Sequence, residues 1–157
     1  GLPTLLMDKV GLDSGFMIPQ YTTAALVTEN KTLCFPASAD SIPTSLGQED
    51  HVSMGSISAR KLNQVIDNLE YILSIEMLLA AQAIEFRRPL KSSALIECMH
   101  SLIRTKIEFA IEDRVFANDI GKAVALFRDP SFLSTCNQES LSKGVDLNQG
   151  FSALSQY

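Results

Sequence analysis

Five polar side chains that could do chemistry lie within six positions of the chain: Gln48, Glu49, Asp50, His51 and Ser53. Acid, imidazole and hydroxyl groups are the types found in a hydrolase triad, but a triad is defined by its geometry in space, and sequence neighbours rarely converge in that way. No G-x-S-x-G segment indicates a nucleophile elbow. On spacing alone, the acidic cluster is more typical of the start of a helix, where the macrodipole favours negative charge.

Metal and phosphate chemistry find little support in the sequence. A metal site needs several converging ligands, and no ligand spacing links the two histidines, His51 and His100. We expect His100 to be an ordinary helix residue, either solvated or at the core edge, and His51 to anchor its loop. There is no glycine-rich phosphate loop. The net charge of −5 gives no electrostatic footprint for nucleic acid.

The polar cluster lies at the end of a long loop between two predicted helices. Apolar residues at helical spacing predict a helix over residues 17–30, with Pro19 tolerated near its first turn. Residues 31–54 then form a loop, and loops of this length are usually functional or disordered. Asp50 and Ser53 are expected to cap the helix that follows.

A long helix over residues 54–87 is the strongest secondary-structure signal. Seven apolar positions form one stripe along it: Leu62, Val65, Ile66, Leu69, Ile72, Leu73 and Leu79. The part from Tyr71 to Phe86 is apolar on nearly all sides, which predicts burial on all sides. A membrane span is the rival interpretation, but the apolar run is short and Glu76 interrupts it. The chain has too few helices to surround this one, so we expect partners from other chains or from further sequence.

The remainder of the chain predicts shorter helices and then an irregular tail. Helices are expected over residues 92–113 and 118–127, the second capped by Asn118 or Asp119. Residues 1–130 are expected to be the helical part and residues 131–157 an irregular tail. The predicted fold class is all-α, a long-helix bundle with one long polar loop.

The cysteines and the first residues bear on where the protein works. Cys34, Cys98 and Cys136 are odd in number and widely spaced, which favours reduced thiols in the cytoplasm over a disulfide framework. No signal peptide is visible. The chain begins at Gly1 and not at a methionine, as expected for a piece of a longer protein.

Four segments resemble the aromatic amino-acid ammonia-lyase family, in order over roughly residues 1–130. They are GLDSGFMIPQYTTAALVTENK, PASADSIPTSLGQEDHVSMG, ARK at 59–61 and AAQAIEFRRPLK at 80–91. They look like the C-terminal part of such an enzyme. The segment from Gln48 to Met54 is similar to the histidine ammonia-lyase branch, whereas phenylalanine lyases typically carry an Asn-Gln-Asp type sequence there.

The resemblance implies a helical homotetramer that converts L-histidine to trans-urocanate and ammonia. Family members use an electrophile, 4-methylidene-imidazol-5-one, formed from an internal Ala-Ser-Gly, and a base that takes the β-proton. This chain contains no Ala-Ser-Gly. The resemblance therefore implies that these residues alone are inactive and need an N-terminal part or other subunits.

Three residues of this chain match positions that the family places near its substrate. Glu49 matches a carboxylate that faces the substrate imidazole and is the catalytic candidate. Met17 matches a soft apolar contact near the substrate ring, although ordinary helix packing explains it nearly as well. Gln48 is expected to bond within the site or to fix its loop.

Three alternatives stay open. One is another aromatic amino-acid ammonia-lyase or an aminomutase. A second is a non-catalytic helical oligomerisation module derived from such an enzyme. A third is a proteolytic remnant of the complete enzyme, stable because its helices pack together.

Overall fold

The computed structural model describes residues 1–9, 11–49 and 51–144. Within these residues there are two short 3-10 turns, five α-helices and no strand: η1 (Thr4–Leu6), α1 (Met17–Leu33), η2 (Ser45–Gly47), α2 (Gly55–Glu85), α3 (Ala94–Arg104), α4 (Phe116–Arg128) and α5 (Pro130–Ser142). The all-α prediction is confirmed. No helix in the described part of the chain is long and apolar enough to cross a membrane.

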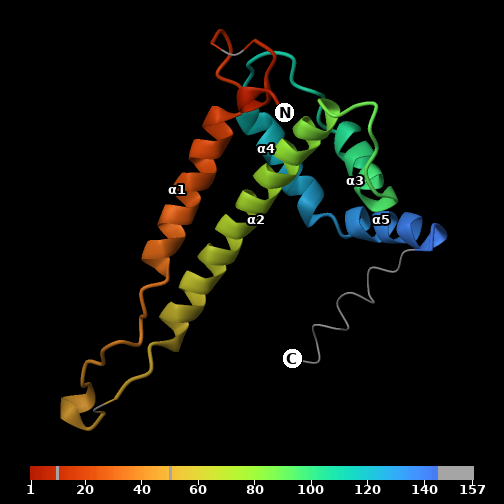
Figure 1. Ribbon diagram of the computed structural model, residues 1–157. Coiled ribbons are helices and arrows are strands. Elements are labelled where there is room, and N and C mark those ends of the chain that lie inside the picture. The colour runs from red at the N-terminus through yellow and green to blue at the C-terminus, as the bar shows by residue number, and fades with distance from the viewer. Residues whose placement is uncertain (10, 50, 145–157) are drawn as a thin grey trace.

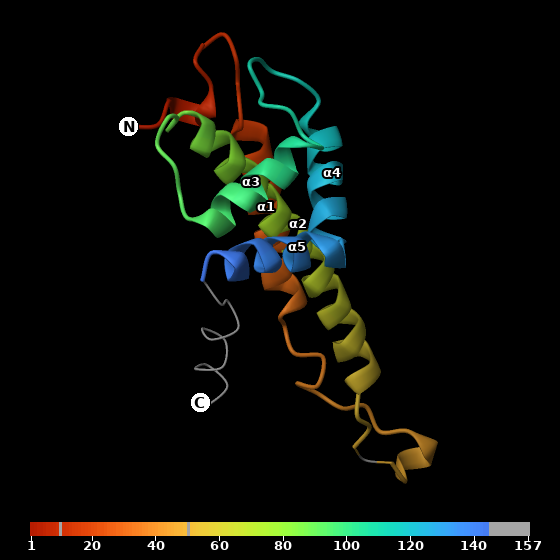
Figure 2. The same ribbon diagram turned by 90° about the vertical axis from the view of Figure 1, so that its right-hand side faces the viewer.

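Helices α1 and α2 form an antiparallel hairpin (Figures 1 and 2). Residues 34–54, which we call the arm, join them at the end of the hairpin that lies away from the other helices. Near that end, Asn68 Nδ2 of α2 donates to Glu29 Oε2 at 2.8 Å and to Asn30 Oδ1 at 2.9 Å. Polar contacts therefore align the two helices where the hairpin leaves the core.

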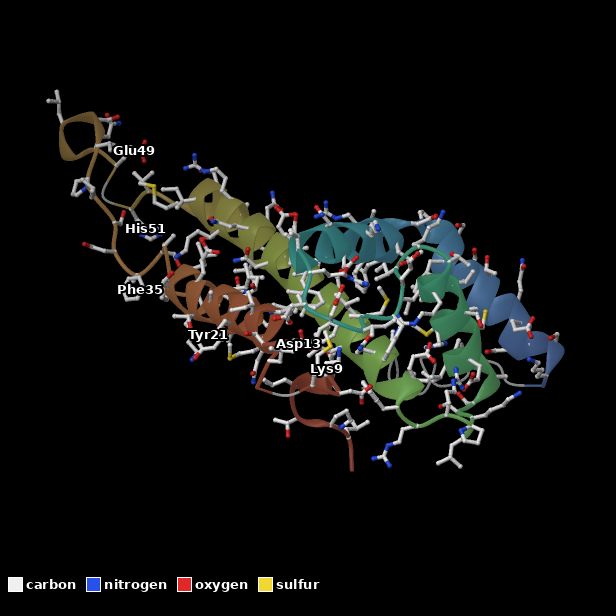
Figure 3. All side chains as sticks on the ribbon, turned by 90° about the horizontal axis from the view of Figure 1, so that it is seen from above. Lys9, Asp13, Tyr21, Phe35, Glu49 and His51 are labelled. Atoms are coloured by element: carbon white, nitrogen blue, oxygen red, sulfur yellow. The ribbon has the colours of Figure 1, made fainter. Side chains whose placement is uncertain are left out.

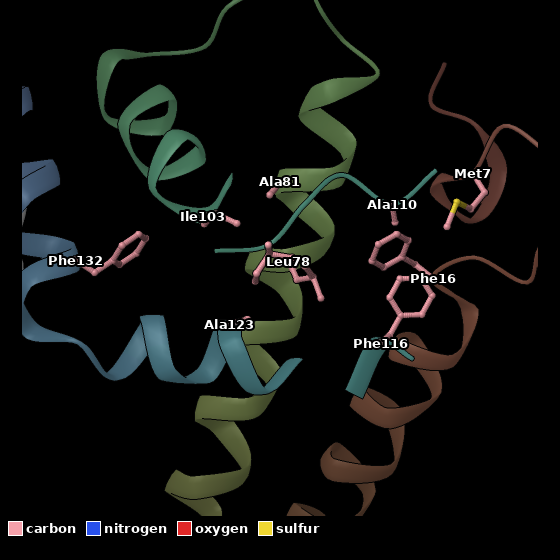
Figure 4. Close-up of a cluster of buried hydrophobic side chains, with 10 residues drawn as sticks. Met7, Phe16, Leu78, Ala81, Ile103, Ala110, Phe116, Ala123 and Phe132 are labelled. Carbon is pink, nitrogen blue, oxygen red and sulfur yellow. The ribbon is translucent and has the colours of Figure 1, made fainter. Parts of the chain in front are cut away.

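The hydrophobic core lies at the opposite end of the hairpin, where α4 packs on α2 and α3 packs on α5 (Figure 4). The Phe16 and Phe116 rings meet there with centroids 4.6 Å apart. The buried cluster draws on the segment before α1, on α2 to α5 and on the stretch after α3, and none of its members lies in the arm: Met7, Phe16, Leu78, Ala81, Ile103, Ile107, Ala110, Phe116, Ala123 and Phe132. The body is thus built without the arm.

A single buried amide ties two irregular segments to α2. Gln82 is 1% exposed, and its Nε2 donates to Leu6 O at 3.2 Å and to Ala110 O at 2.9 Å. The Ala110 N–H donates back to Gln82 Oε1 at 3.1 Å. Every polar atom of the amide is used, so burial leaves none unsatisfied.

Several predicted helix boundaries and caps were wrong. Among the described residues no side chain caps α2, whose N-cap is Met54, so Ser53 does not cap it; Asp50, the other predicted cap, lies outside the described residues. The helix predicted over 92–113 ends at Arg104, because the backbone of Ala110 bonds to Gln82 instead of continuing a helix. Helix α4 begins at Phe116 with no side-chain cap. Neither Asn118 nor Asp119 caps α4, and Asp119 instead accepts a 2.7 Å hydrogen bond from Arg114 Nε.

The irregular tail predicted over 131–157 is wrong for its first part. Pro130–Ser142 form α5, capped by Asp129, which accepts from the Ser131 N–H at 2.8 Å. Phe132, Cys136 and Ser140 recur every fourth residue and are buried, so packing outweighs a polar composition. Residues 145–157 lie outside the described residues.

The outer face of α2 is open in this chain. Ile75, Leu78 and Ala81 are buried, but the opposite side is not. The seven-residue stripe predicted from the sequence divides in two: Val65, Ile72 and Leu79 are half-buried, whereas Leu62, Ile66, Leu69 and Leu73 are 38% to 57% exposed. We call these four exposed residues the α2 stripe. Burial on all sides, which was predicted for Tyr71–Phe86, is not achieved among the described residues, because Tyr71 and Leu73 are 40% and 38% exposed.

Candidate functional site

The arm that carries the polar cluster is held as a narrow loop. At its base, Lys61 Nζ of α2 donates to the backbone oxygen of Phe35. Further out, the Val52 N–H donates to Ser41 Oγ at 2.8 Å. These bonds tie both sides of the arm together although it contributes nothing to the core.

A strained turn at the tip of the arm fixes the backbone of Glu49. The Thr44 N–H donates to Glu49 O at 3.0 Å, and the Glu49 N–H donates to Thr44 O at 3.2 Å. Between them Ser45, Leu46 and Gly47 have φ values of +54°, +60° and +84°. Left-handed backbone is costly for residues other than glycine and tends to occur at functional sites. This turn therefore marks the tip of the arm as a candidate site.

The side chains of the polar cluster are exposed. Figure 3 shows Glu49 and His51 on the arm, Gln48 is exposed as well, and no described residue donates to the Glu49 carboxylate. Asp50 lies outside the described residues. An exposed carboxylate on a fixed backbone is free to accept a hydrogen bond from a ligand or from another chain.

Met17 lies far from Glu49. It is the first residue of α1, at the core end of the hairpin, whereas the arm follows the last residue, Leu33. The 17 residues of α1 span about 25 Å, more than the length of one histidine molecule. A single chain therefore does not bring Met17 and Glu49 to one substrate, although Gln48 and Glu49 are neighbours.

The turn before Met17 is clamped from across the chain. Asp113 accepts hydrogen bonds from the Ser14 N–H at Oδ2 and from the Gly15 N–H at Oδ1, both at 2.7 Å. The Asp113 N–H in turn donates to Asp13 Oδ1 at 3.3 Å. The sequence carried no signal for this contact, because its partners are about 100 positions apart.

A second polar cluster lies where α2 meets α3, and it includes His100. Arg88 Nη1 donates to both Glu97 oxygens, at 3.0 and 2.9 Å. Glu85 Oε1 accepts from Arg104 Nε at 3.1 Å and lies 3.0 Å from His100 Nε2. His100 is 6% exposed, so it is buried in a charged network and is more than a plain helix residue at the core edge.

The surroundings of His100 disfavour its charged form. Burial lowers its pKa below the ordinary value of 6.5, and the charges of Arg104 and Arg88 lower it further, while Glu85 and Glu97 oppose the change. In the described part of the chain, no group of three or more His, Cys, Asp or Glu side chains could hold a metal ion.

A comparison with known proteins places the chain in a family. The sequence pattern described as aromatic amino acid lyase matches residues 1–105, two thirds of the chain. The chain belongs to the aromatic amino acid lyase family. The suspected family resemblance is confirmed, and α4 and α5 lie beyond the matched residues.

Individual relatives within the family are similar to this chain in sequence and in structure. The chain is 53% identical over 132 residues to the histidine ammonia-lyase of Desulfotalea psychrophila. The aligned residues cover 84% of the chain and 26% of that protein. The crystal structure of histidine ammonia-lyase from Trypanosoma cruzi superposes with a TM-score of 0.84 at 48% identity, covering 88% of the chain and 27% of the other. Tyrosine aminomutase from Streptomyces globisporus gives a TM-score of 0.82 at 36% identity over 88% of the chain and 27% of its own length. The chain thus spans about a quarter of the length of these relatives.

Proposed function

We propose that this chain acts as part of a histidine ammonia-lyase, which eliminates ammonia from L-histidine to give trans-urocanate. The observation that carries this proposal is the identity of about 50% to histidine ammonia-lyases over more than four fifths of the chain. The Gln48–Met54 segment, which is similar to that of the histidine branch, supports the same substrate.

Glu49 is the proposed catalytic residue of this chain. Its carboxylate accepts a hydrogen bond from an imidazole N–H of the substrate and stabilises a positive charge on the ring. A second role as a base for the β-proton is compatible with the same placement. Both roles are supported by the exposed side chain, since no described residue occupies its carboxylate and the pairing with Thr44 holds its backbone.

Met17 and Gln48 are the proposed substrate contacts besides Glu49. Gln48 lies beside Glu49 on the arm, where its amide can bond to the substrate or hold the loop. Met17 supplies a soft apolar contact to the ring. Because α1 separates Met17 from Glu49, we propose that one substrate meets Met17 of one chain and Glu49 of another.

The prosthetic group of the family does not fit the residues of this chain. Family members form 4-methylidene-imidazol-5-one from an Ala-Ser-Gly segment, and these 157 residues contain none. The group would come from sequence outside this chain, so no step is assigned to it here. We accordingly propose that the chain alone does not eliminate ammonia.

The α2 stripe is the proposed site of assembly with further copies. Leu62, Ile66, Leu69 and Leu73 are spaced four, three and four residues apart, the spacing of a coiled-coil seam. An antiparallel or parallel pair of such seams is self-complementary, which favours a second copy of the chain as the partner. We propose a homotetramer in the cytoplasm.

The tyrosine aminomutase likeness keeps a second candidate open. Its helices superpose nearly as well as those of the histidine enzyme, so the fold alone does not choose the substrate. The identity of 36% against about 50% favours the histidine enzyme.

The test uses the complete reading frame that encodes this chain, incubated with L-histidine while urocanate is followed by ultraviolet absorbance. Glu49→Gln should lower turnover by about 100-fold or more, the range of a positioned acid or base. Glu139→Gln is the matched control, because Glu139 is an exposed residue of α5. Full turnover by Glu49→Gln, or elimination from L-tyrosine in place of L-histidine, would contradict the proposal.

A further inference from the structure

The geometry points to Asp113 as a positioning residue: by clamping the Ser14–Gly15 turn, it sets where Met17 lies. The clamp itself is a property of the structure. Its meaning for catalysis rests on the proposed function, in which Met17 contacts the substrate. Residue 113 lies beyond residues 1–105, which match the family pattern.

The clamp is a two-point contact. One carboxylate accepts from two consecutive backbone N–H groups, Ser14 and Gly15, each at 2.7 Å. Hydrogen bonds to an ionised acceptor are short and about twice as strong as neutral ones. Because both oxygens are engaged, the contact fixes the direction of the turn as well as its distance from residue 113. The first turn of α1 starts two residues later.

The conformation of the turn is restricted by its neighbours. Gly15 has a φ of +57°, and a Cβ atom there would lie 2.6 Å from Leu5 O and 2.7 Å from Met7 Cγ. The next residue, Phe16, donates its N–H to Leu5 O at 3.0 Å and packs its ring on Phe116. Glycine adopts this left-handed conformation without strain, whereas any other residue would clash, so the close approach of the turn to Leu5 and Met7 depends on Gly15.

Met17 follows this turn directly. Its Cα is two peptide bonds from Gly15, so a rotation of the turn moves the start of α1 and the Met17 side chain with it. Asp113 is anchored in return, since its own N–H donates to Asp13 Oδ1. Asp113 therefore acts on Met17 through the turn and needs no contact with the substrate.

The first test uses this chain and methionine methyl NMR. The chain has five methionines, so each methyl signal can be assigned by substitution. In Asp113→Asn, an amide NH2 replaces one of the two carboxylate oxygens. That group cannot accept a hydrogen bond from the backbone N–H of Ser14 or Gly15, so one of the two bonds of the clamp is lost. We expect the Met17 methyl signal to shift and broaden, with those of Met54, Met77 and Met99 unchanged. Asp67→Asn, an exposed site on α2, is the control.

Two results of that experiment would overturn the assignment. An unchanged Met17 signal would mean that Asp113 does not set its position. Equal changes at Met54, Met77 and Met99 would mean that Asp113 supports the fold as a whole.

The second test is a double-mutant cycle in the complete reading frame. Asp113→Asn should raise KM for L-histidine about 10-fold with kcat within about twofold, as expected for a misplaced binding contact. In a Met17→Ala background, the same change should add nothing further. Additive effects would overturn the assignment. If the parent enzyme forms no urocanate, the proposed function fails, while the NMR experiment still decides the clamp.

Discussion

Arg88 Nη2 lies 3.2 Å from His100 Nδ1. An arginine guanidinium only donates hydrogen bonds, so Nδ1 must accept. In the neutral ring this assigns the proton to Nε2, which lies 3.0 Å from Glu85 Oε1 but is not placed to hydrogen-bond with it. A second proton would have to enter at Nδ1, against the Arg88 N–H. Neutral His100 is thus part of the link between α2 and α3.

The stability of the chain should therefore fall in mild acid. Burial lowers the pKa of His100 in the folded state, and Arg104 and Arg88 add to the effect. In the unfolded state the pKa of His100 is about 6.5. Between this value and the lower pKa of the folded state, the unfolded chain therefore binds more protons than the folded chain. The contribution of neutral His100 is complete above the unfolded pKa and is lost as pH falls through the folded one. Urea unfolding at pH 7.5, 6.5 and 5.5 measures it.

The controls for that experiment are two glutamine variants. His100→Gln should lower stability at pH 7.5 and flatten the pH dependence. His51→Gln should leave the slope as in the wild type, because His51 is exposed on the arm and outside the network. Equal slopes for wild type and His100→Gln would contradict the assignment of the proton to this residue.

Two glycine-to-alanine changes should have opposite effects. Gly15→Ala places a Cβ against Leu5 O in left-handed backbone and should lower the free energy of unfolding by about 2 kcal/mol or more. Gly121→Ala lies inside α4 with nothing within 4 Å, and should raise it by about 0.5–1 kcal/mol. Thermal unfolding of both variants measures the difference. A neutral Gly15→Ala would mean that the turn is loosely held.

Removal of the Gln82 amide should be costly. Gln82→Leu keeps most of the volume but leaves the buried Ala110 N–H and C=O without partners. Each such group costs about 1–3 kcal/mol, so a loss of about 3 kcal/mol is expected. Gln64→Leu, an exposed change on the same helix, should alter stability by less than about 0.5 kcal/mol. Chemical denaturation measures the free energy of unfolding of both variants. Similar losses in the two variants would contradict a special contribution of the Gln82 hydrogen bonds to stability.

Charges on the α2 stripe should prevent self-association. Ile66→Glu with Leu69→Glu places two carboxylates in the proposed seam, where burial without partners is unfavourable. Sedimentation velocity should show association for the wild type and a smaller species for this variant. Thr135→Glu with Gln138→Glu adds the same charge on exposed α5 positions and should leave association unchanged. An unaltered assembly in the stripe variant would place the interface elsewhere.

The sequence was sufficient for the elements that depend on local pattern. The helical spacing around Tyr21 and Leu69 predicted α1 and α2, and the polar segment between them predicted the arm. Family resemblance supplied Glu49, Gln48 and Met17, whose roles remain proposals. The apolar character of α2 led us to expect partners from other chains or from further sequence, and that expectation stays a prediction; in this chain Leu62, Ile66, Leu69 and Leu73 are exposed.

The contacts that override local pattern could not be predicted. The end of α3 at Arg104 depends on Gln82 bonding to Ala110, and the turn at Gly15 depends on Asp113. Both pairs are distant in the sequence, so no spacing indicates them. Helix α5 was missed because Phe132 and Cys136 give only a weak apolar stripe in a polar segment.

The separation of the arm from the core also bears on how such a protein can change over time. Substitutions that a core residue such as Leu78 would not tolerate are compatible with folding at Gln48 or Leu46, because the arm buries no member of the hydrophobic cluster. Under the proposed function, in which Gln48 and Glu49 meet the substrate, selection for a new substrate can act on the tip of the arm while the helices stay constant. A shared body in histidine ammonia-lyase and tyrosine aminomutase, two enzymes named for different amino acids, is the outcome expected of such modular evolution.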